Sequence, residues 1–477
     1  MGKSITSNFL WRFGERFFAQ LVTLIVSIIL ARLLEPSAYG VVAIVSIFVS
    51  LVQTFIDSGL GNALIQKKNA SSEDFSTVFY FNLILCFILY SIIWMASPVI
   101  AAFYENMDLV LMIRVISLSI FISGLKNIQQ AYVARNMIFK KFFFATFLGT
   151  IISAIVGIYL AYKGAGAWAL IMQQLTNNFV DMVILWIVVK WRPSLEFSFL
   201  SLRRLFSYGW KLTAADFIGK CYDQIRDLVI GKKYSSSDLA FFTKGKQFPH
   251  ILITNINTSM DSVLLPAMSN VQDIRTRVKE LARKSIVTST FLLFPMLIGL
   301  ACCSDLVIKV LLGDKWLPCV PYLRIFCIIS LFYPLHTSNL NAIKSVGRSD
   351  IYFVLDVIKK SIGLIILLIT YKYGPFMIAI GMIFDSLFSL LLNAYPTKKL
   401  IDYGLLSQVR DISQNMVYSI IMGVIVFIID IDGVTPIFVL IVKVFTGVAV
   451  YFLICKITNY KVFNSYLFKL KSLWSKK

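Results

Sequence analysis

The sequence predicts an all-α polytopic membrane protein, and three observations support this fold class. Hydrophobic residues make up 58% of the 477 residues, whereas charged residues contribute only 15%. A soluble domain has about 45–50% apolar and about 25% charged residues, so this chain would expose too much apolar surface to water. Aromatic residues reach 14%, which is the opposite of a disordered composition. In addition, apolar runs long enough to cross a bilayer recur along the whole chain.

Fourteen segments reach the roughly 20 mainly apolar residues that a membrane-spanning helix needs. They lie at 16–34, 38–60, 77–103, 109–133, 142–162, 165–189, 205–231, 240–265, 285–308, 318–343, 351–371, 375–397, 412–430 and 434–455. With a cytoplasmic N-terminus, 29 of the 46 Lys and Arg residues fall on the inner side and 7 on the outer side. Cytoplasmic loops are enriched in these residues, so both termini are predicted to be cytoplasmic. The net charge of +21 is therefore assigned to the loops and not to a nucleic-acid partner.

The elements are not equally well supported. The first span, 16–34, follows a basic stretch, but its apolar run is too long for a secretory signal and no small-residue cleavage site follows. The eighth span, 240–265, is the weakest because its second half is only moderately apolar. The longest polar connection, Val271–Ser285, is predicted to form a short amphipathic helix on the cytoplasmic side.

Polar residues recur at i, i+4, i+7 and i+11 in four spans, which places each set on one helix face. The first pair of stripes, displaced by 200 residues, is Arg16, Gln20, Thr23, Ser27 and Asp216, Lys220, Asp223, Asp227. The second pair, displaced by 204 residues, is Ser46, Ser50, Gln53, Asp57 and His250, Thr254, Asn257, Asp261. These stripes indicate an internal repeat. The alternative is that they are ordinary polar residues of a large bundle.

The repeat predicts two six-helix lobes that run in the same direction across the membrane, because six is an even number. Such parallel repeats are typical of transporters, with the polar faces lining the seam between the halves. The predicted organisation is an N-terminal lobe at 1–200, a C-terminal lobe at 201–400, and two additional helices with a basic cytoplasmic tail at 401–477.

Several Lys and Arg residues lie inside the predicted spans, where ionisable groups are costly and usually face a cavity or one another. A cavity with several cations suits an anionic cargo. Phosphate is the usual anion in membranes, and Arg binds it in a bidentate geometry. The candidate substrate-binding residues of this cationic cavity are Arg16, Arg114, Lys126, Lys220, Arg226, Lys244 and Arg324.

Other roles remain open for three of these cations. Asp216 and Asp223 lie at i−4 and i+3 from Lys220, so that stripe could neutralise itself by salt bridges. Arg114 and Lys126 have no acidic residue one turn away. They could instead pair with another helix or extend toward the membrane surface.

Intramembrane carboxylates are the usual relay groups of ion-driven transporters. The candidates for coupling to H⁺ or Na⁺ are Asp57, Asp223, Asp261 and Asp385. A further carboxylate, Asp356, has Lys359 and Lys360 at i+3 and i+4, so an ion pair is the expected role for it.

Motifs for catalysis, energy use or metal binding are missing. The seven cysteines lie mostly in apolar runs without metal-ligand spacing, and only two histidines exist. No phosphate-binding loop of the GxxxxGK[ST] type occurs. We therefore expect no catalytic residues, no cofactor and no metal site.

The order of several short motifs resembles bacterial polysaccharide exporters, the Wzx-type flippases. The resemblance is strongest for the WzxC-like branch of the multidrug/oligosaccharidyl-lipid/polysaccharide superfamily, and it extends to about residue 400. It is carried by Leu30–Lys68, with Arg32, Leu33, Pro36, Tyr39-Gly40, Asp57, Gly59, Gly61 and Ile65-Gln66-Lys67, and by Ser76–Leu83, Phe139-Lys140, Gly164–Leu170 and Trp191–Pro193.

The resemblance implies a two-lobe bundle around a cationic cavity and alternating access driven by an ion gradient. The implied cargo is an oligosaccharide on undecaprenyl diphosphate, moved from the cytoplasmic to the outer leaflet of the bacterial inner membrane for O-antigen, capsule or exopolysaccharide synthesis. The diphosphate would meet the cations while the lipid tail stays in the bilayer. A polysaccharide polymerase and glycosyltransferases are the partners that the family implies.

Two alternatives remain. A cation-coupled drug or metabolite exporter of the same fold would favour a negatively charged cavity, which the surplus of intramembrane cations opposes. A membrane polysaccharide polymerase or ligase would need a large outer loop with catalytic residues, and the predicted outer loops are short. The sequence thus favours a transporter over an enzyme.

Overall fold

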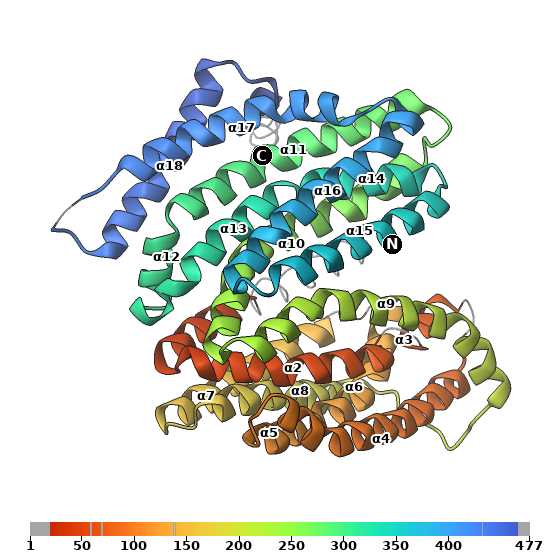
Figure 1. Ribbon diagram of the computed structural model, residues 1–477. Helices are drawn as coiled ribbons and strands as arrows, with labels where there is room; N and C mark the ends of the chain where they lie inside the picture. The colour runs from red at the N-terminus through yellow and green to blue at the C-terminus, as the bar shows by residue number, and fades with distance from the viewer. Residues whose placement is uncertain are drawn as a thin grey trace, which may run out of the picture. The chain divides into compact units, whose positions relative to one another are not determined.

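A computed structural model describes residues 20–57, 60–67, 70–136, 138, 140–431 and 433–465. Within these ranges all regular secondary structure is helical, and helices occupy each of the fourteen predicted spans. The chain divides into two compact units, Met1–Ala240 and Phe241–Lys477 (Figure 1). The prediction of an all-α membrane protein is therefore confirmed.

The first unit contains a helix at Gln20–Leu33 followed by a series of longer and shorter helices. They are α2 (Pro36–Asp57), α3 (Leu60–Gln66), α4 (Ser72–Phe103), α5 (Asp108–Ile116), α6 (Leu118–Arg135), α7 (Lys140–Tyr162), α8 (Ala167–Val188) and α9 (Phe199–Lys233). Helix α9 packs on α2, α3 and α4 within this unit. The lobes inferred from the sequence repeat stay a prediction.

Helix α10 (Ser236–Ser269) begins in the first unit and continues into the second. The second unit contains α11 (Arg275–Cys302), α12 (Ser304–Leu311), a 3₁₀ helix η1 (Asp314–Cys319), α13 (Val320–Leu331), α14 (Tyr333–Ser345), α15 (Ser349–Thr370), α16 (Pro375–Ile401), α17 (Leu405–Ile428) and α18 (Pro436–Ile457). The polar connection at Val271–Ser285 is a turn that leads directly into the first turns of α11.

Eight helical segments among the described residues are long and apolar enough to cross a membrane. They are Pro36–Asp57, Ser72–Phe103, Asp108–Arg135, Arg275–Cys302, Asp314–Ser345, Pro375–Ile401, Leu405–Ile428 and Pro436–Ile457. Shorter apolar helices lie at Gln20–Leu33 and Thr146–Tyr162. The chain is a multi-pass membrane protein.

Three predicted spans are interrupted within the described residues. The span at 285–308 breaks at Cys303, between α11 and α12. The span at 109–133 breaks at Ser117, whose hydroxyl donates to the carbonyl of Ile113 at 2.6 Å and competes with the helical ladder. The span at 318–343 breaks at Phe332, two residues before Pro334, which lacks a backbone N–H. Each of the three spans is therefore divided between two helices: α5 and α6, α11 and α12, and α13 and α14.

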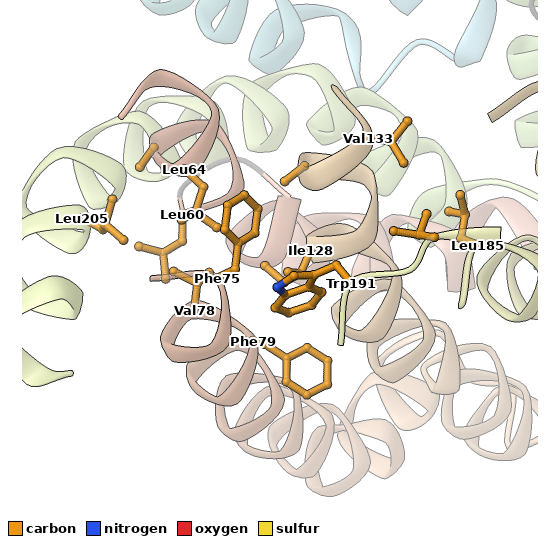
Figure 2. Close-up of a cluster of buried hydrophobic side chains, with 13 residues drawn as sticks. Leu60, Leu64, Phe75, Val78, Phe79, Ile128, Val133, Leu185, Trp191 and Leu205 are labelled. Carbon is orange, nitrogen blue, oxygen red and sulfur yellow. The ribbon is translucent and has the colours of Figure 1, made fainter. Parts of the chain in front are cut away.

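A cluster of buried aromatic and aliphatic side chains holds α3, α4, α6 and the segment after α8 together. Figure 2 shows the Trp191 ring beside Phe79 and Ile128. The centroid of that ring is 5.8 Å from Phe75 and 6.4 Å from Phe79. Burial of large rings removes much apolar area from water, so this cluster stabilises the ends of the helices that carry the site described below.

Candidate functional site

Four charged side chains from four helices of the first unit form a charge cluster, which we define as Asp57, Lys126, Asp181 and Lys220. They come from the last residue of α2 and from the interiors of α6, α8 and α9. The charges of Lys126 and Lys220 both act on Asp57. The structure thus brings together three residues that the sequence singled out, and adds a fourth.

Side-chain amides join α2 to α6 beside this cluster. The Nδ2 atom of Asn127 donates to the carbonyl of Ile56 at 2.9 Å and to Oδ1 of Asp57 at 3.3 Å. One turn earlier, Nε2 of Gln53 donates to the hydroxyl of Ser123. Asn127 therefore satisfies a carbonyl at the end of α2 and positions the Asp57 carboxylate.

Lys126 is held in an ion pair. Its Nζ atom lies 3.0 Å from Oδ2 of Asp181, and the two side chains are 16% and 10% exposed. The other carboxylate oxygen, Oδ1 of Asp181, is buried and has no hydrogen-bond partner among the described residues. A partly buried pair of this kind is costly unless all its polar atoms are satisfied.

Lys220 has a different partner from those the sequence offered. Its Nζ atom donates to the backbone carbonyl of Ser50 on α2 at 3.1 Å. Asp216 and Asp223 are exposed on α9, and neither forms an ion pair with Lys220 among the described residues. The ammonium of Lys220 therefore carries a charge that no carboxylate on its own helix neutralises.

The remaining candidate cations of the first unit have contact partners outside the charge cluster. Arg226 is 6% exposed, and its NH2 atom donates to the hydroxyl of Tyr222 at 3.2 Å. Arg114 donates from Nε to the hydroxyl of Ser97 at 3.0 Å, and its guanidinium lies 4.1 Å from the centroid of Trp94. Arg16 lies outside the described residues.

In the second unit each candidate cation has its own local partners. Lys244 is 8% exposed and lies 5.9 Å from the centroid of the Trp316 ring. Arg324 forms an ion pair with Asp305 and donates from Nε to the hydroxyl of Ser304 at 2.9 Å.

The acidic candidates of the second unit are also separate. Asp261 accepts a hydrogen bond from Nδ2 of Asn341 at 2.6 Å. The charge of Asp385 acts on Lys359. As expected, Asp356 forms an ion pair with Lys360, at 2.7 Å.

Two of the interrupted spans, the fourth and the tenth, carry matching arginines. Arg114 precedes the break at Ser117, and Arg324 precedes the break at Phe332. In both units the Nε atom of the arginine donates to a serine hydroxyl that lies earlier in the chain. This local correspondence is independent of the polar stripes.

The second unit also contains two cavities. One, of about 450 Å³, is lined by apolar side chains of α11, α17 and α18 and by Lys443. Lys443 is 8% exposed and has no hydrogen-bond or ion-pair partner among the described residues. The other, of about 670 Å³, is lined by polar residues including Arg283, Lys284 and Asp411.

One carboxylate that lines the polar cavity, that of Asp411, has a partner for each of its two oxygens. Arg283 lies 2.6 Å from Oδ1 of Asp411, and the hydroxyl of Tyr403 donates to Oδ2 at 2.9 Å. Burial, and secondarily the hydrogen bond to Asp411, raises the pKa of Tyr403. The phenol therefore keeps its proton and its role as a donor.

Within the described residues no group of three or more His, Cys, Asp or Glu side chains could hold a metal ion. The seven cysteines are all free thiols.

Among the residues of the predicted spans, the sequence analysis missed two buried charged side chains, Asp181 and Lys443. Both lie inside predicted spans, at 165–189 and 434–455. Intramembrane ionisable residues usually face a cavity or a partner, and this rule also covers Asp181 and Lys443. The sequence therefore contained a signal that could have identified them as candidates. By contrast, the pairing of Lys126 with Asp181 follows only from the packing of α6 against α8.

Comparison with known proteins gives matches in sequence and in structure. The sequence profile described as "Polysaccharide biosynthesis protein" matches residues 29–321. The teichuronic acid biosynthesis protein TuaB of Bacillus subtilis is 24% identical over 306 residues, 64% of this chain and 63% of TuaB. The match thus spans less than two thirds of the length of TuaB.

The lipopolysaccharide biosynthesis protein WzxC of Escherichia coli is 22% identical over 339 residues, 69% of this chain and 68% of WzxC. Among solved structures, an inward closed conformation of the lipid II flippase MurJ superposes with a TM-score of 0.77. That match covers 95% of this chain and 99% of MurJ at 16% identity, so it shows a shared fold.

Proposed function

Because the chain belongs to the polysaccharide biosynthesis protein family, we propose that it moves a lipid-linked oligosaccharide from the cytoplasmic to the outer leaflet of the bacterial inner membrane. The resemblance predicted from Leu30–Lys68 is confirmed by the profile and by WzxC. The fold shared with the lipid II flippase MurJ supports a transporter rather than an enzyme.

The charge cluster is the observation that carries the proposal. Lys126 and Lys220 place two ammonium groups inside the membrane-spanning part of the first unit, beside two carboxylates. Ammonium groups bind phosphate as point charges, and they do so more strongly where water is scarce. The diphosphate that links a lipid to its sugars is the cargo group that fits them.

The apolar cavity of the second unit supports a lipid cargo. Its lining from α11, α17 and α18 is almost entirely hydrocarbon, which suits an isoprenoid chain and excludes sugars. Lys443 adds a single buried ammonium group to this lining. The proposed cargo, with its apolar tail and anionic linker, matches both features.

Alternating access is proposed to use two lobes of parallel repeat, with α17 and α18 as additions. Two of the three interrupted spans correspond under this repeat, since α5 with α6 is the fourth span and α13 with α14 is the tenth, six spans later. Discontinuous helices at corresponding positions of two halves are typical of transporters. The energy would come from an H⁺ or Na⁺ gradient acting on intramembrane carboxylates.

Both termini are proposed to lie in the cytoplasm. A polymerase and glycosyltransferases would act on the same glycan at the two membrane faces. This arrangement follows from the positive-inside count and from the family, and the cargo would be loaded where its sugars are assembled.

The test is deletion of the gene in its native host, followed by analysis of lipids and surface glycan. We expect a lipid-linked oligosaccharide to accumulate on the cytoplasmic leaflet and surface polysaccharide to disappear. Complementation with the Lys126→Gln variant should leave both defects in place, whereas Lys163→Gln, an exposed lysine of the same unit, should restore export.

Other outcomes would identify the alternatives. An unchanged lipid pool with normal glycan would point to a drug or metabolite exporter. Repeat units that are flipped but not polymerised would point to a polymerase or ligase.

A further inference from the structure

The polar cavity of the second unit lies where three spans end. Its lining comes from the first turns of α11, from the start of α17 and from the chain that follows α18. These segments adjoin the predicted spans 285–308, 412–430 and 434–455 on the side predicted to be cytoplasmic. The cavity volume of about 670 Å³ is typical of ligand pockets. A molecule larger than a single ion can therefore occupy it.

The wall of the cavity after α18 is fixed by packing. Asn459 adopts a left-handed conformation, with φ of 48°, and the backbone N–H of Tyr460 donates back to the last turn of α18 at 3.0 Å. The side chains of Tyr460 and Phe463 are buried in a cluster with Phe291 of α11. The turn that leads to Lys461 is therefore held against the helices that form the rest of the cavity.

Both carboxylates that line the cavity have partners of their own. Asp411, whose side chain is 10% exposed, accepts from Arg283 on one oxygen and from the hydroxyl of Tyr403 on the other. Glu280 pairs with Arg277 on the same helix at 3.3 Å. The remaining cations of the lining are therefore not needed to neutralise these carboxylates.

Those cations are Lys284 and Lys461. Their ammonium groups have no hydrogen-bond or ion-pair partner within the described part of the chain. The side-chain amides of Gln414 and Asn459 add neutral donors to the same lining. Phosphate oxygens accept hydrogen bonds from all these groups, and most strongly from the charged ones. The lining thus fits a phosphate group.

Apolar side chains lie beside the cavity on the membrane side. Val417 of α17 is 50% exposed, and Leu453 and Ile457 of α18 are 54% and 75% exposed. They are within two turns of the lining residues Gln414 and Thr458. In a bilayer such side chains contact acyl chains, and basic pockets between spans at the cytoplasmic surface bind the headgroups of anionic lipids.

We propose that the polar cavity binds the phosphate group of an anionic phospholipid, with Lys284 and Lys461 as its ammonium ligands. The acyl chains lie along the exposed apolar side chains of α17 and α18. This inference goes beyond the proposed function, because it concerns a lipid of the bilayer and does not depend on transport of the cargo. A soluble phosphate compound shares the chemistry of the headgroup, so the experiment separates the two sources.

The experiment is native mass spectrometry of the full-length protein in detergent, with phosphatidylglycerol and phosphatidylcholine of the same acyl chains. We expect tighter binding of phosphatidylglycerol, because the choline cation of the other lipid opposes the two lysines. Lys284→Gln and Lys461→Gln should each weaken phosphatidylglycerol binding about fivefold, and the double variant about 25-fold. Glu280→Gln removes a carboxylate from the lining and should strengthen this binding.

The matched control is the double variant Arg410→Gln with Lys456→Gln. Both side chains are exposed near the ends of the same helices, and neither lines the cavity. The control loses the same charge, but it should bind phosphatidylglycerol as wild type does. An equal loss in the two double variants would overturn the proposal, since general surface charge would then explain the binding. Equal binding of the two lipids by wild type would also overturn it.

Inorganic pyrophosphate tests the soluble source. We expect phosphatidylglycerol to stay bound in a molar excess of pyrophosphate, because the soluble probe has no acyl chains to bury. Displacement of the lipid by pyrophosphate would assign the cavity to a soluble phosphate compound and overturn the lipid assignment.

Discussion

Glycine is required at position 40 because α2 approaches the first residue of α10 without room for a side chain. A Cβ atom added to Gly40 would lie 1.7 Å from the backbone oxygen of Ser236. A backbone atom cannot turn aside as a flexible side chain can. The close approach therefore depends on a single hydrogen in place of a methyl group.

We expect Gly40→Val to lower the free energy of unfolding by at least the roughly 1–3 kcal/mol that is typical of overpacking, because α2 must move away from Ser236. Thermal unfolding of the purified protein in detergent measures this change. The matched control is Gly219→Ala in α9, where an added Cβ meets no atom within 4 Å. That variant should be neutral, or more stable by up to about 1 kcal/mol. Equal stability of the two variants would contradict the steric explanation.

Lys220 and Arg226 lie six residues apart on α9; Lys220 donates to the carbonyl of Ser50 and Arg226 to the hydroxyl of Tyr222. We expect Lys220→Ala and Arg226→Ala to reduce export strongly while membrane insertion is unchanged. Loss of one charged hydrogen bond to cargo is worth about 1.5–3 kcal/mol, so export should fall by about tenfold or more. Surface glycan and protein level in the membrane fraction are the two readouts. Full export by both variants would remove α9 from the proposed substrate path.

At the scale of elements, the buried cluster around Trp191 joins helices that are far apart in the sequence. The cluster takes residues from α3, α4, α6 and α8 and from the first turns of α9 (Figure 2). The indole Nε1 of Trp191 has no hydrogen-bond partner among the described residues. The ring therefore contributes through packing, and its N–H contributes nothing favourable.

Truncation and conservative replacement of Trp191 should differ in effect. Trp191→Ala leaves a cavity beside Phe75 and Phe79, and should destabilise the protein by about 3–5 kcal/mol. Trp191→Phe keeps an aromatic ring and removes the unpartnered N–H, so it should lower the free energy of unfolding clearly less than Trp191→Ala. Thermal unfolding in detergent compares the two. An equal loss of stability for Phe and for Ala would contradict the explanation by packing.

The tenth predicted span contains a helix break and polar contacts that its hydropathy does not reveal. Its apolar sequence predicts one continuous helix, but Pro334 removes a backbone donor and the helix restarts at Tyr333. Buried polar side chains of α14 then find partners on neighbouring helices. Nδ2 of Asn339 donates to Gln408 at 3.0 Å, and His336 contacts Ser386 and Asn393, each at 3.2 Å.

At the scale of the whole molecule, the distribution of positive charge predicts the topology. We expect green fluorescent protein fused after Lys477 to fluoresce and alkaline phosphatase fused there to be inactive, because the C-terminus is predicted to be cytoplasmic. Phosphatase fused at Asn106, between the third and fourth predicted spans, should be active. The opposite pattern at both sites would invert the topology. The same pattern at both sites would indicate an even number of spans between them instead of the predicted odd number.

Hydropathy and composition by themselves determined that this chain is a helical membrane protein, where its spans lie, and that ionisable groups are buried in them. These properties could be predicted because the length of an apolar run is local and the bilayer imposes the same requirement on every span. The order of short motifs from Arg32 to Trp191 was also enough to identify the family.

The partners of the buried charges were decided only by the tertiary structure. Lys126 and Asp181 are 55 residues apart, and Lys220 reaches the carbonyl of Ser50 across 170 residues. Such pairs depend on the rotation and crossing of whole helices, which the pattern on one helix does not specify. For Lys220 the local pattern favoured Asp216 and Asp223, and helix packing gave it a backbone carbonyl instead, because α9 lies against α2.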